Sequence, residues 1–350
     1  MQNLFNKFTD RFFSNEESVY FGILLLGSFL FLFLFGGYLL PVLVSLVIAF
    51  LLNGLLGMLK SINLSHKVSL ALTLLVFFSF YSAMFFVLPS VGKQVNSLMQ
   101  SLPLIVISFQ ETLAGLSTSY PEILSEDGMQ SLFINLSSQL NNLLNNALGQ
   151  LAGTISFLFS AVFFIILVPL MVFFFVKDKE LLLPMLTIFL PKKRGFMHSV
   201  FSEMNDQLFN YVTGKFIEMV IVASVSYLVF VSLGLPYSVL MSILVGLSVI
   251  IPFFGAILVT IPVALIGLYE WGLTDTFYWL MGLYLLIQVL DGNFLVPILF
   301  SSRNNLHPVI IIISVLFFGG IWGFWGLFFA IPLATFVKAI YSSWPEPELK

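Results

Sequence analysis

Two long apolar stretches, Leu235–Tyr269 and Leu306–Tyr341, follow the same pattern about seventy residues apart in the chain. Each opens on a proline after a polar turn, at Pro236 and at Pro308, and each is interrupted near its middle by glycine and proline. Interrupted apolar segments at corresponding positions of two halves are typical of membrane carriers, where they line the binding site. The chain is therefore predicted to contain a duplicated, broken apolar unit.

The interruptions lie at Ile251–Gly255 and at Gly319–Gly326, and each stretch closes near a second proline. The arms on either side have about 14 to 17 residues, which is short for a full membrane crossing at 1.5 Å per residue. We therefore expect two re-entrant hairpins with their tips inside the protein, although full-length tilted pairs are an alternative. The predicted hairpin breaks are Pro252, Gly255, Pro262, Gly319, Gly320, Gly323 and Pro332.

The composition requires a membrane environment. Hydrophobic residues make up 59% of the 350 residues and charged residues only 9%, too little polar surface to cover a soluble globule of this size. The chain has no cysteine, which excludes disulfides and thiolate chemistry, and its net charge of -3 gives no basic footprint for nucleic acid. We expect an all-α protein in the lipid bilayer, with no cofactor and no metal centre.

A spanning helix needs about 20 apolar residues, and six runs approach that length. They are Phe21–Leu40, Pro41–Leu59, Val68–Leu88, Gly153–Val176, Phe216–Leu233 and Phe277–Leu299. With two returning hairpins, this order places most lysines and arginines on one side, which the positive-inside rule makes cytoplasmic. The same order predicts cytoplasmic termini and two oppositely oriented repeats.

The domain organisation follows from these runs. We predict an N-terminal frame of three helices over 1–88, an amphipathic extracytoplasmic helical region over 89–152, and a fourth helix with a basic cytoplasmic linker over 153–213. Repeat 1 then spans 214–272, and repeat 2 with the C-terminal tail spans 273–350. In the amphipathic region one apolar stripe runs from Leu98 to Leu116 and a second from Leu132 to Leu151. Such helices either pack on a neighbour or the membrane surface, or cover their own transmembrane core.

Several sequence words match a known family in order and spacing. They include FFFVKDKE at 173–180, YVTGKF at 211–216, IIPFFG at 250–255, DGNFLVPILF at 291–300 and NLHP at 305–308. On these motifs the chain resembles the bacterial autoinducer-2 exporter family, also called PerM-type permeases. The resemblance implies export of a small furanosyl signal used in quorum sensing, or sodium/proton exchange. The family usually has glutamine where this chain has Lys215.

Two carboxylates fall inside apolar helices. Glu218 lies 18 residues before Pro236, and Asp291 lies 17 residues before Pro308. A charge at a helix centre costs about 2.5 to 3.5 kcal/mol on insertion scales, which suggests a function such as holding Na⁺ or carrying H⁺. The alternatives are that Lys215 simply neutralises Glu218 as an i, i+3 neighbour, and that Asp291 caps a half-helix near the interface.

Three further polar residues are candidates for the ion or substrate path. Asn293, near Pro297, is expected to interrupt the sixth helix and to offer an amide to a cation or a hydroxyl group. Gln288 lies one turn before Asp291 and either joins it or bonds across helices. His307 begins the second hairpin, where it either titrates with the proton gradient or is only solvated.

Enzymatic motifs such as HExxH, GxSxG and the P-loop are absent, so we do not expect an enzyme. The preferred hypothesis is a multi-pass carrier of the bacterial inner membrane that exports a small polar solute, coupled to H⁺ or Na⁺, with a homo-oligomer possible. A Na⁺/H⁺ antiporter is the first alternative. A membrane scaffold for envelope processes, acting through residues 89–152, is the second.

Overall fold

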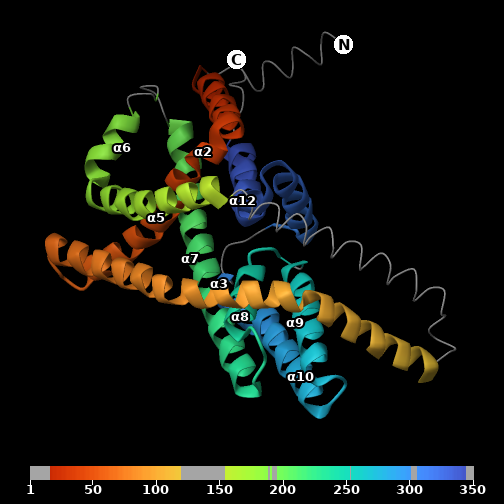
Figure 1. Ribbon diagram of the computed structural model, residues 1–350. Coiled ribbons are helices and arrows are strands. Elements are labelled where there is room, and N and C mark those ends of the chain that lie inside the picture. Colours follow the sequence, from red (N-terminus) through yellow and green to blue (C-terminus); the bar gives the residue numbers. More distant parts are fainter. Residues whose placement is uncertain are drawn as a thin grey trace, which may run out of the picture. The chain divides into compact units, whose positions relative to one another are not determined.

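The computed structural model describes residues 16–119, 154–187, 190, 195–252, 254–300 and 306–343, and every regular element within them is helical (Figure 1). This confirms the all-α prediction for that part of the chain. The elements are α2 (Glu16–Ser61), α3 (His66–Ser119), α5 (Thr154–Lys177), α6 (Lys179–Thr187), α7 (Gly195–Leu233), α8 (Ser238–Ser248), α9 (Phe254–Trp271), α10 (Asp275–Leu290), the π-helical turn η1 (Asp291–Leu295), α11 (Val296–Phe300) and α12 (Pro308–Ser343).

Six helical segments among the described residues are long and apolar enough to cross a membrane. They are Val19–Ser61, His66–Gly115, Gly195–Leu233, Phe254–Trp271, Asp275–Phe300 and Phe324–Ser342. The number agrees with the prediction, but two of the six are the second arms of the predicted hairpins. These arms are longer than expected from the sequence. The fourth predicted crossing, Gly153–Val176, corresponds to α5, a helix of 24 residues.

The first two predicted crossings are not separate helices. Phe21–Leu40 and Pro41–Leu59 lie in α2, a single helix of 46 residues that runs on without turning back (red to orange in Figure 1). The expected turn at Pro41 is therefore wrong. A proline removes one helical hydrogen bond, but the chain around Pro41 has no polar turn residues that would favour a reversal. The hydroxyl of Ser45 also donates to the Pro41 carbonyl, 2.6 Å away, within the same helix.

Two other predicted boundaries do not end a helix. α3 continues from the third predicted crossing through Pro89 and Pro103 to Ser119, and α7 begins at Gly195 and continues to Leu233. The expected surface helix before the fifth crossing is thus the first part of α7. Gly214, at that boundary, does not break the helix. It lets the ring of Phe300 approach, since an added Cβ would lie 2.6 Å from Phe300 Cε1.

The chain forms two compact units, each built from separate stretches of sequence. Unit 1 contains residues 1–79, 164–214 and 300–350, and unit 2 contains residues 80–163 and 215–299. The boundaries fall within α3, α5, α7 and α11, so single helices contribute to both units. The predicted division into five consecutive segments concerns sequence order and stays a prediction.

In unit 2, the second half of α7 packs with α8, α9 and α10 around a buried apolar core. The apolar stripe of α3 joins this core, because Ile105 is only 2% exposed and Leu98 and Leu102 pack against it. The first part of the α3 stripe, from Leu98 to Ile105, therefore covers the protein's own core. The second stripe, Leu132–Leu151, lies outside the described residues.

In unit 1, the first half of α7 packs against α2 and α12. One cluster contains Phe21, Met197 and Ala339, and a second contains Tyr211 and Ile331. Both are apolar, and polar contacts orient the helices: the Met197 N–H, near the start of α7, donates to the Glu17 carboxylate at 2.9 Å. A carboxylate at a helix N-terminus compensates the unpaired amides and the positive end of the helix dipole.

The first predicted break is confirmed. α8 ends at Ser248 and α9 begins at Phe254, with Pro252 between them, where the missing N–H and the restricted preceding residue stop the helix. α8 and α9 pack against each other. Gly255 makes this close return possible, because an added Cβ would overlap the carbonyl of Ser248.

The second predicted break lies at Gly323, whose φ of 58° and ψ of -133° interrupt α12. Gly326, three residues later, sits where an added Cβ would overlap the Phe318 carbonyl. Gly319 and Gly320 are helical residues of the first arm. Both broken units thus close on a glycine that contacts a carbonyl of the preceding arm. Whether they are oppositely oriented stays a prediction.

Pro262 and Pro332 are not breaks, so this part of the prediction is wrong. They lie inside α9 and α12, which continue on both sides. A proline within an apolar helix loses one hydrogen bond, and neighbouring hydroxyls can satisfy the exposed carbonyls. The carbonyl that Pro332 leaves free is that of Phe328, four residues earlier, and the Tyr211 hydroxyl donates to it at 3.2 Å.

The two closing glycines give a stability prediction. Gly255→Ala and Gly326→Ala should each destabilise the protein by about 1 to 3 kcal/mol, because the added methyl group overlaps backbone that cannot rotate away. Gly282→Ala in α10 is the matched control, since an added Cβ there meets nothing within 4 Å. Thermal unfolding of the purified variants in detergent measures the effect. Equal melting temperatures for Gly255→Ala and Gly282→Ala would contradict the packing described.

Candidate functional site

A buried ion pair lies in α7, where Lys215 and Glu218 face each other one turn apart. The Lys215 Nζ is 3.0 Å from Glu218 Oε1 and 2.9 Å from Oε2. Lys215 is 7% exposed and Glu218 only 1%, so the pair is almost completely removed from solvent. The mutual neutralisation considered for Glu218 from the sequence is thus present. Such a pair is stable only if further hydrogen bonds satisfy the charges.

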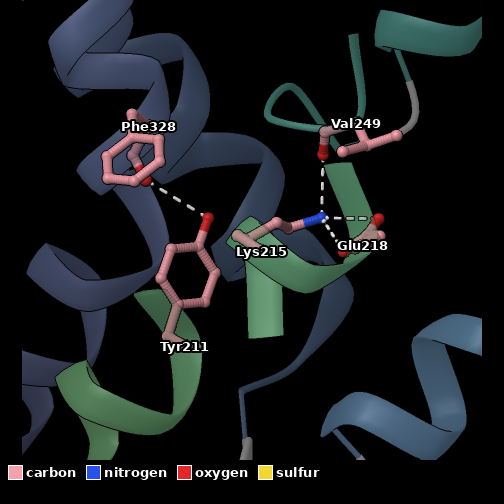
Figure 2. Close-up of polar contacts among 5 residues, drawn as sticks. All are labelled: Tyr211, Lys215, Glu218, Val249 and Phe328. Carbon is pink, nitrogen blue, oxygen red and sulfur yellow. Dashed lines mark hydrogen bonds and ion pairs between the residues drawn. The ribbon is translucent and has the colours of Figure 1, made fainter. Parts of the chain in front are cut away.

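The third contact of the ammonium group is a backbone carbonyl. Lys215 Nζ donates to the Val249 carbonyl at 2.8 Å, and Figure 2 shows the nitrogen between this oxygen and the Glu218 carboxylate. Val249 follows the last residue of α8, where carbonyls have no helical partner and the helix dipole is negative. The cation therefore stabilises the end of α8 and ties the first hairpin break to α7.

Side chains from α3 hold the opposite end of α8. The Leu240 N–H, in its first turn, donates to Gln94 Oε1 at 2.9 Å, and the Tyr237 hydroxyl donates to Ser101 Oγ at 3.0 Å. Tyr237 has a positive φ of 60°, a left-handed conformation that the Ser101 contact helps to fix. A helix of 11 residues is too short to be stable alone, so these contacts position α8 for the Lys215 site.

Asp291 is close enough to both Lys215 and Glu218 to interact with them electrostatically. Its Oδ1 atom is buried and has no hydrogen-bond partner, and the same is true of Gln288 Nε2, one turn earlier on α10. The structure thus brings together four of the six residues that the sequence predicted: Lys215, Glu218, Gln288 and Asp291. They supply one cation and two carboxylates.

The expected interruption of the sixth helix takes the form of a π-helical turn. In η1 the Val296 N–H bonds back five residues to the Asp291 carbonyl, one residue further than in an α-helix. Pro297 follows this turn and has no N–H to offer. π-Turns inside α-helices are frequent at functional sites. Asn293, by contrast, is exposed and donates to the Val289 carbonyl of its own helix at 2.9 Å, apart from the charged cluster.

Asp291 also borders an apolar groove of about 260 Å³ between α7 and the α10–η1–α11 segment. Its other lining residues are Ile221, Val222, Val225, Ile287, Leu290, Phe294, Leu295 and Ile298. Asp291 is the one ionisable residue in this lining. Asp291 thus contributes to the wall of the groove, whereas Glu218, which is 1% exposed, does not.

A buried polar chain extends the site along α10 and was not anticipated from the sequence. The Tyr284 hydroxyl, 0% exposed, is 3.1 Å from Thr260 Oγ1 and donates to the Ala256 carbonyl of α9 at 3.3 Å. Tyr284, Gln288 and Asp291 are spaced i, i+4 and i+7, the spacing of one helix face, which was the available signal.

His307 lies in unit 1, directly before α12. It is exposed, and its Nδ1 atom accepts a hydrogen bond from the Val309 N–H at 3.3 Å. The side chain thus satisfies one of the free amides at the helix N-terminus. This local contact accounts for its position, and a titrating function stays a prediction.

Comparisons with known proteins place the chain in a functional class. It is 39% identical to "Putative permease PerM" of Escherichia coli strain K12 over 340 residues, covering 97% of this chain and 96% of that protein. It is 26% identical to "Putative transport protein YueF" of Bacillus subtilis, covering 86% and 82%, and 25% identical to "Putative transport protein YrrI" of the same organism, covering 86% and 84%.

The apolar spans, the broken helices and these relatives together define a multi-pass membrane transporter. The family model described as "AI-2E family transporter" matches residues 21–346, nearly the whole chain. The protein belongs to the AI-2E transporter family.

The ion pair gives a second prediction. Lys215→Met should destabilise the protein by about 3 to 5 kcal/mol, because it leaves the buried Glu218 carboxylate without its cation. The double variant Lys215→Met/Glu218→Gln removes both charges and should recover most of the loss. Lys93→Met, at an exposed site on α3, is the control. Melting in detergent is the readout, and a double variant no more stable than Lys215→Met would contradict the pairing.

Proposed function

We propose that the protein is a secondary transporter of the bacterial inner membrane that exports a small polar solute, similar to autoinducer-2, and is driven by H⁺ or Na⁺. The family description and the names of the relatives support transport, and the earlier motif resemblance supports a small polar signal as cargo.

The observation that carries the proposal is the charge balance of the buried cluster. Lys215 contacts Glu218 directly, so these two charges compensate each other. Asp291 adds a second carboxylate, and its Oδ1 atom has no hydrogen-bond partner although it is buried. An unmatched carboxylate in a low-dielectric site must bind a proton or a cation, and in membrane segments such groups mark ion pathways.

The surrounding elements supply the means of movement. The cluster lies between α7, the break between α8 and α9, and the π-turn of α10–α11. In the proposed mechanism the two broken units are re-entrant and oppositely oriented, and one shifts against a frame of long helices to expose the site alternately. Binding or release of the ion at Asp291 changes the net charge of the cluster, and this change favours one arrangement over the other.

A transport assay with Asp291→Asn tests the proposal. In proteoliposomes with an imposed proton or sodium gradient, the wild type should accumulate a labelled furanosyl solute, and Asp291→Asn should reduce gradient-driven uptake at least tenfold. Asp275→Asn is the matched control, since Asp275 is an exposed carboxylate at the start of the same helix. Uptake that is equal in both variants would contradict a function of Asp291 in coupling.

Na⁺/H⁺ antiport is the second candidate, and the same unmatched carboxylate favours it. The two functions differ in what they require. Antiport needs no solute, so adding Na⁺ to vesicles without solute should change the internal pH in the wild type and not in Asp291→Asn. An internal pH that changes only when the solute is present supports export.

A further inference from the structure

The Lys215 ammonium lies in a position that is built like a site for a monovalent cation. Three oxygens surround the nitrogen at 2.8 to 3.0 Å: both carboxylate oxygens of Glu218 and the carbonyl of Val249. Carboxylate and carbonyl oxygens are the ligands that hard cations take from proteins. The carbonyl comes from the negative end of α8, which adds to the attraction for positive charge. Both side chains are more than nine-tenths buried.

We propose that Lys215 acts as a tethered cation that permanently occupies this oxygen-lined position, so that free Na⁺ does not bind at Glu218 and the exchangeable ion is the proton carried by Asp291. The binding half of this inference concerns Lys215, Glu218 and Val249 alone. The coupling half rests on the proposed transport function.

The assignment of the proton follows from which carboxylate is available. Glu218 is 1% exposed and already holds the ammonium group, and a second cation there would meet the positive charge of Lys215 at close range. Asp291 borders the groove and has a carboxylate oxygen without a hydrogen-bond partner. A bound Na⁺ would need several oxygen ligands to replace its hydration water, and the groove offers few of them. Its other groove neighbours are apolar side chains, which offer no ligand. A proton needs no such shell.

The charged and titratable groups facing the cluster support the same division. They are Lys215 and Glu218 from α7, Asp291 from η1 and Tyr284 from α10, while α8 contributes the Val249 carbonyl. Tyr284 is engaged with Thr260 and the Ala256 carbonyl of α9. Of the two carboxylates that face the cluster, Glu218 is paired directly with Lys215, and Asp291 has no ion pair within the described part of the chain.

Removal of the tethered charge should convert the position into a true cation site. In Lys215→Gln the ammonium is lost while the chain length is nearly kept, and in Lys215→Ala the space itself is opened. Either variant leaves Glu218 and Val249 oxygens without a cation. Na⁺, or ammonium as the free counterpart of the lysine group, should then bind there.

Salt-dependent melting tests the binding half without any transport. The purified wild type and the Lys93→Gln control should melt at the same temperature in sodium chloride and in choline chloride of equal ionic strength. Lys215→Gln and Lys215→Ala should melt higher in sodium or ammonium chloride than in choline chloride, with an increase that saturates. Lys215→Gln/Glu218→Gln should lose this increase, because the carboxylate ligand is gone.

Two results would overturn the inference. The first is a saturable Na⁺ stabilisation of the wild type that Glu218→Gln abolishes, because free Na⁺ would then reach Glu218 despite the lysine. The second is that Lys215→Gln and Lys215→Ala both show the same melting temperature and the same yield of folded protein in sodium or ammonium chloride as in choline chloride. These melting experiments measure no transport. They would therefore still test cation binding at Glu218 and Val249 if the wild type transported no solute.

Discussion

The Lys215 ammonium group holds the centre of unit 2 together through its contacts with Glu218 and Val249. The group compensates Glu218, satisfies the carbonyl end of α8, and lies within electrostatic range of Asp291. In a low-dielectric interior each of these oxygens would be costly without a positive partner. The position of α8 follows from this requirement at its C-terminal end and from Gln94 at its N-terminal end. These contacts fix the break between α8 and α9 next to the Lys215–Glu218 ion pair.

The two broken units use the same backbone solution in different parts of the chain. Gly255 and Gly326 each lie against a carbonyl of the preceding arm, and a side chain at either position would force the arms apart. Non-helical backbone in an apolar environment must have its polar groups satisfied within the protein. In unit 2 the first break meets this requirement through Lys215. In unit 1 the Tyr211 hydroxyl donates at 3.2 Å to the Phe328 carbonyl, which Pro332 leaves without a helical N–H (Figure 2).

The sequence predicted the helical membrane class and the two interruptions from local composition, and its i, i+3 spacing offered the Lys215–Glu218 pair as one of two alternatives for Glu218. It did not predict the long helices. Pro41 and Pro89 coincide with expected ends of spanning helices, yet α2 and α3 continue through them, because tertiary packing and the apolar environment outweigh one lost hydrogen bond. The Val249 carbonyl and the Gln94 contact could not be predicted, since a backbone oxygen has no sequence signature and the two partners are more than thirty residues apart.

The location of the lysine nitrogen is the most direct test of this account. A cryo-EM map of the protein in lipid nanodiscs with sodium present, at a resolution that shows side chains, should have continuous density from Lys215 to Glu218 and to the Val249 carbonyl. Density with Lys215 extended away from Glu218, and a separate ion between Glu218 and Val249, would contradict it.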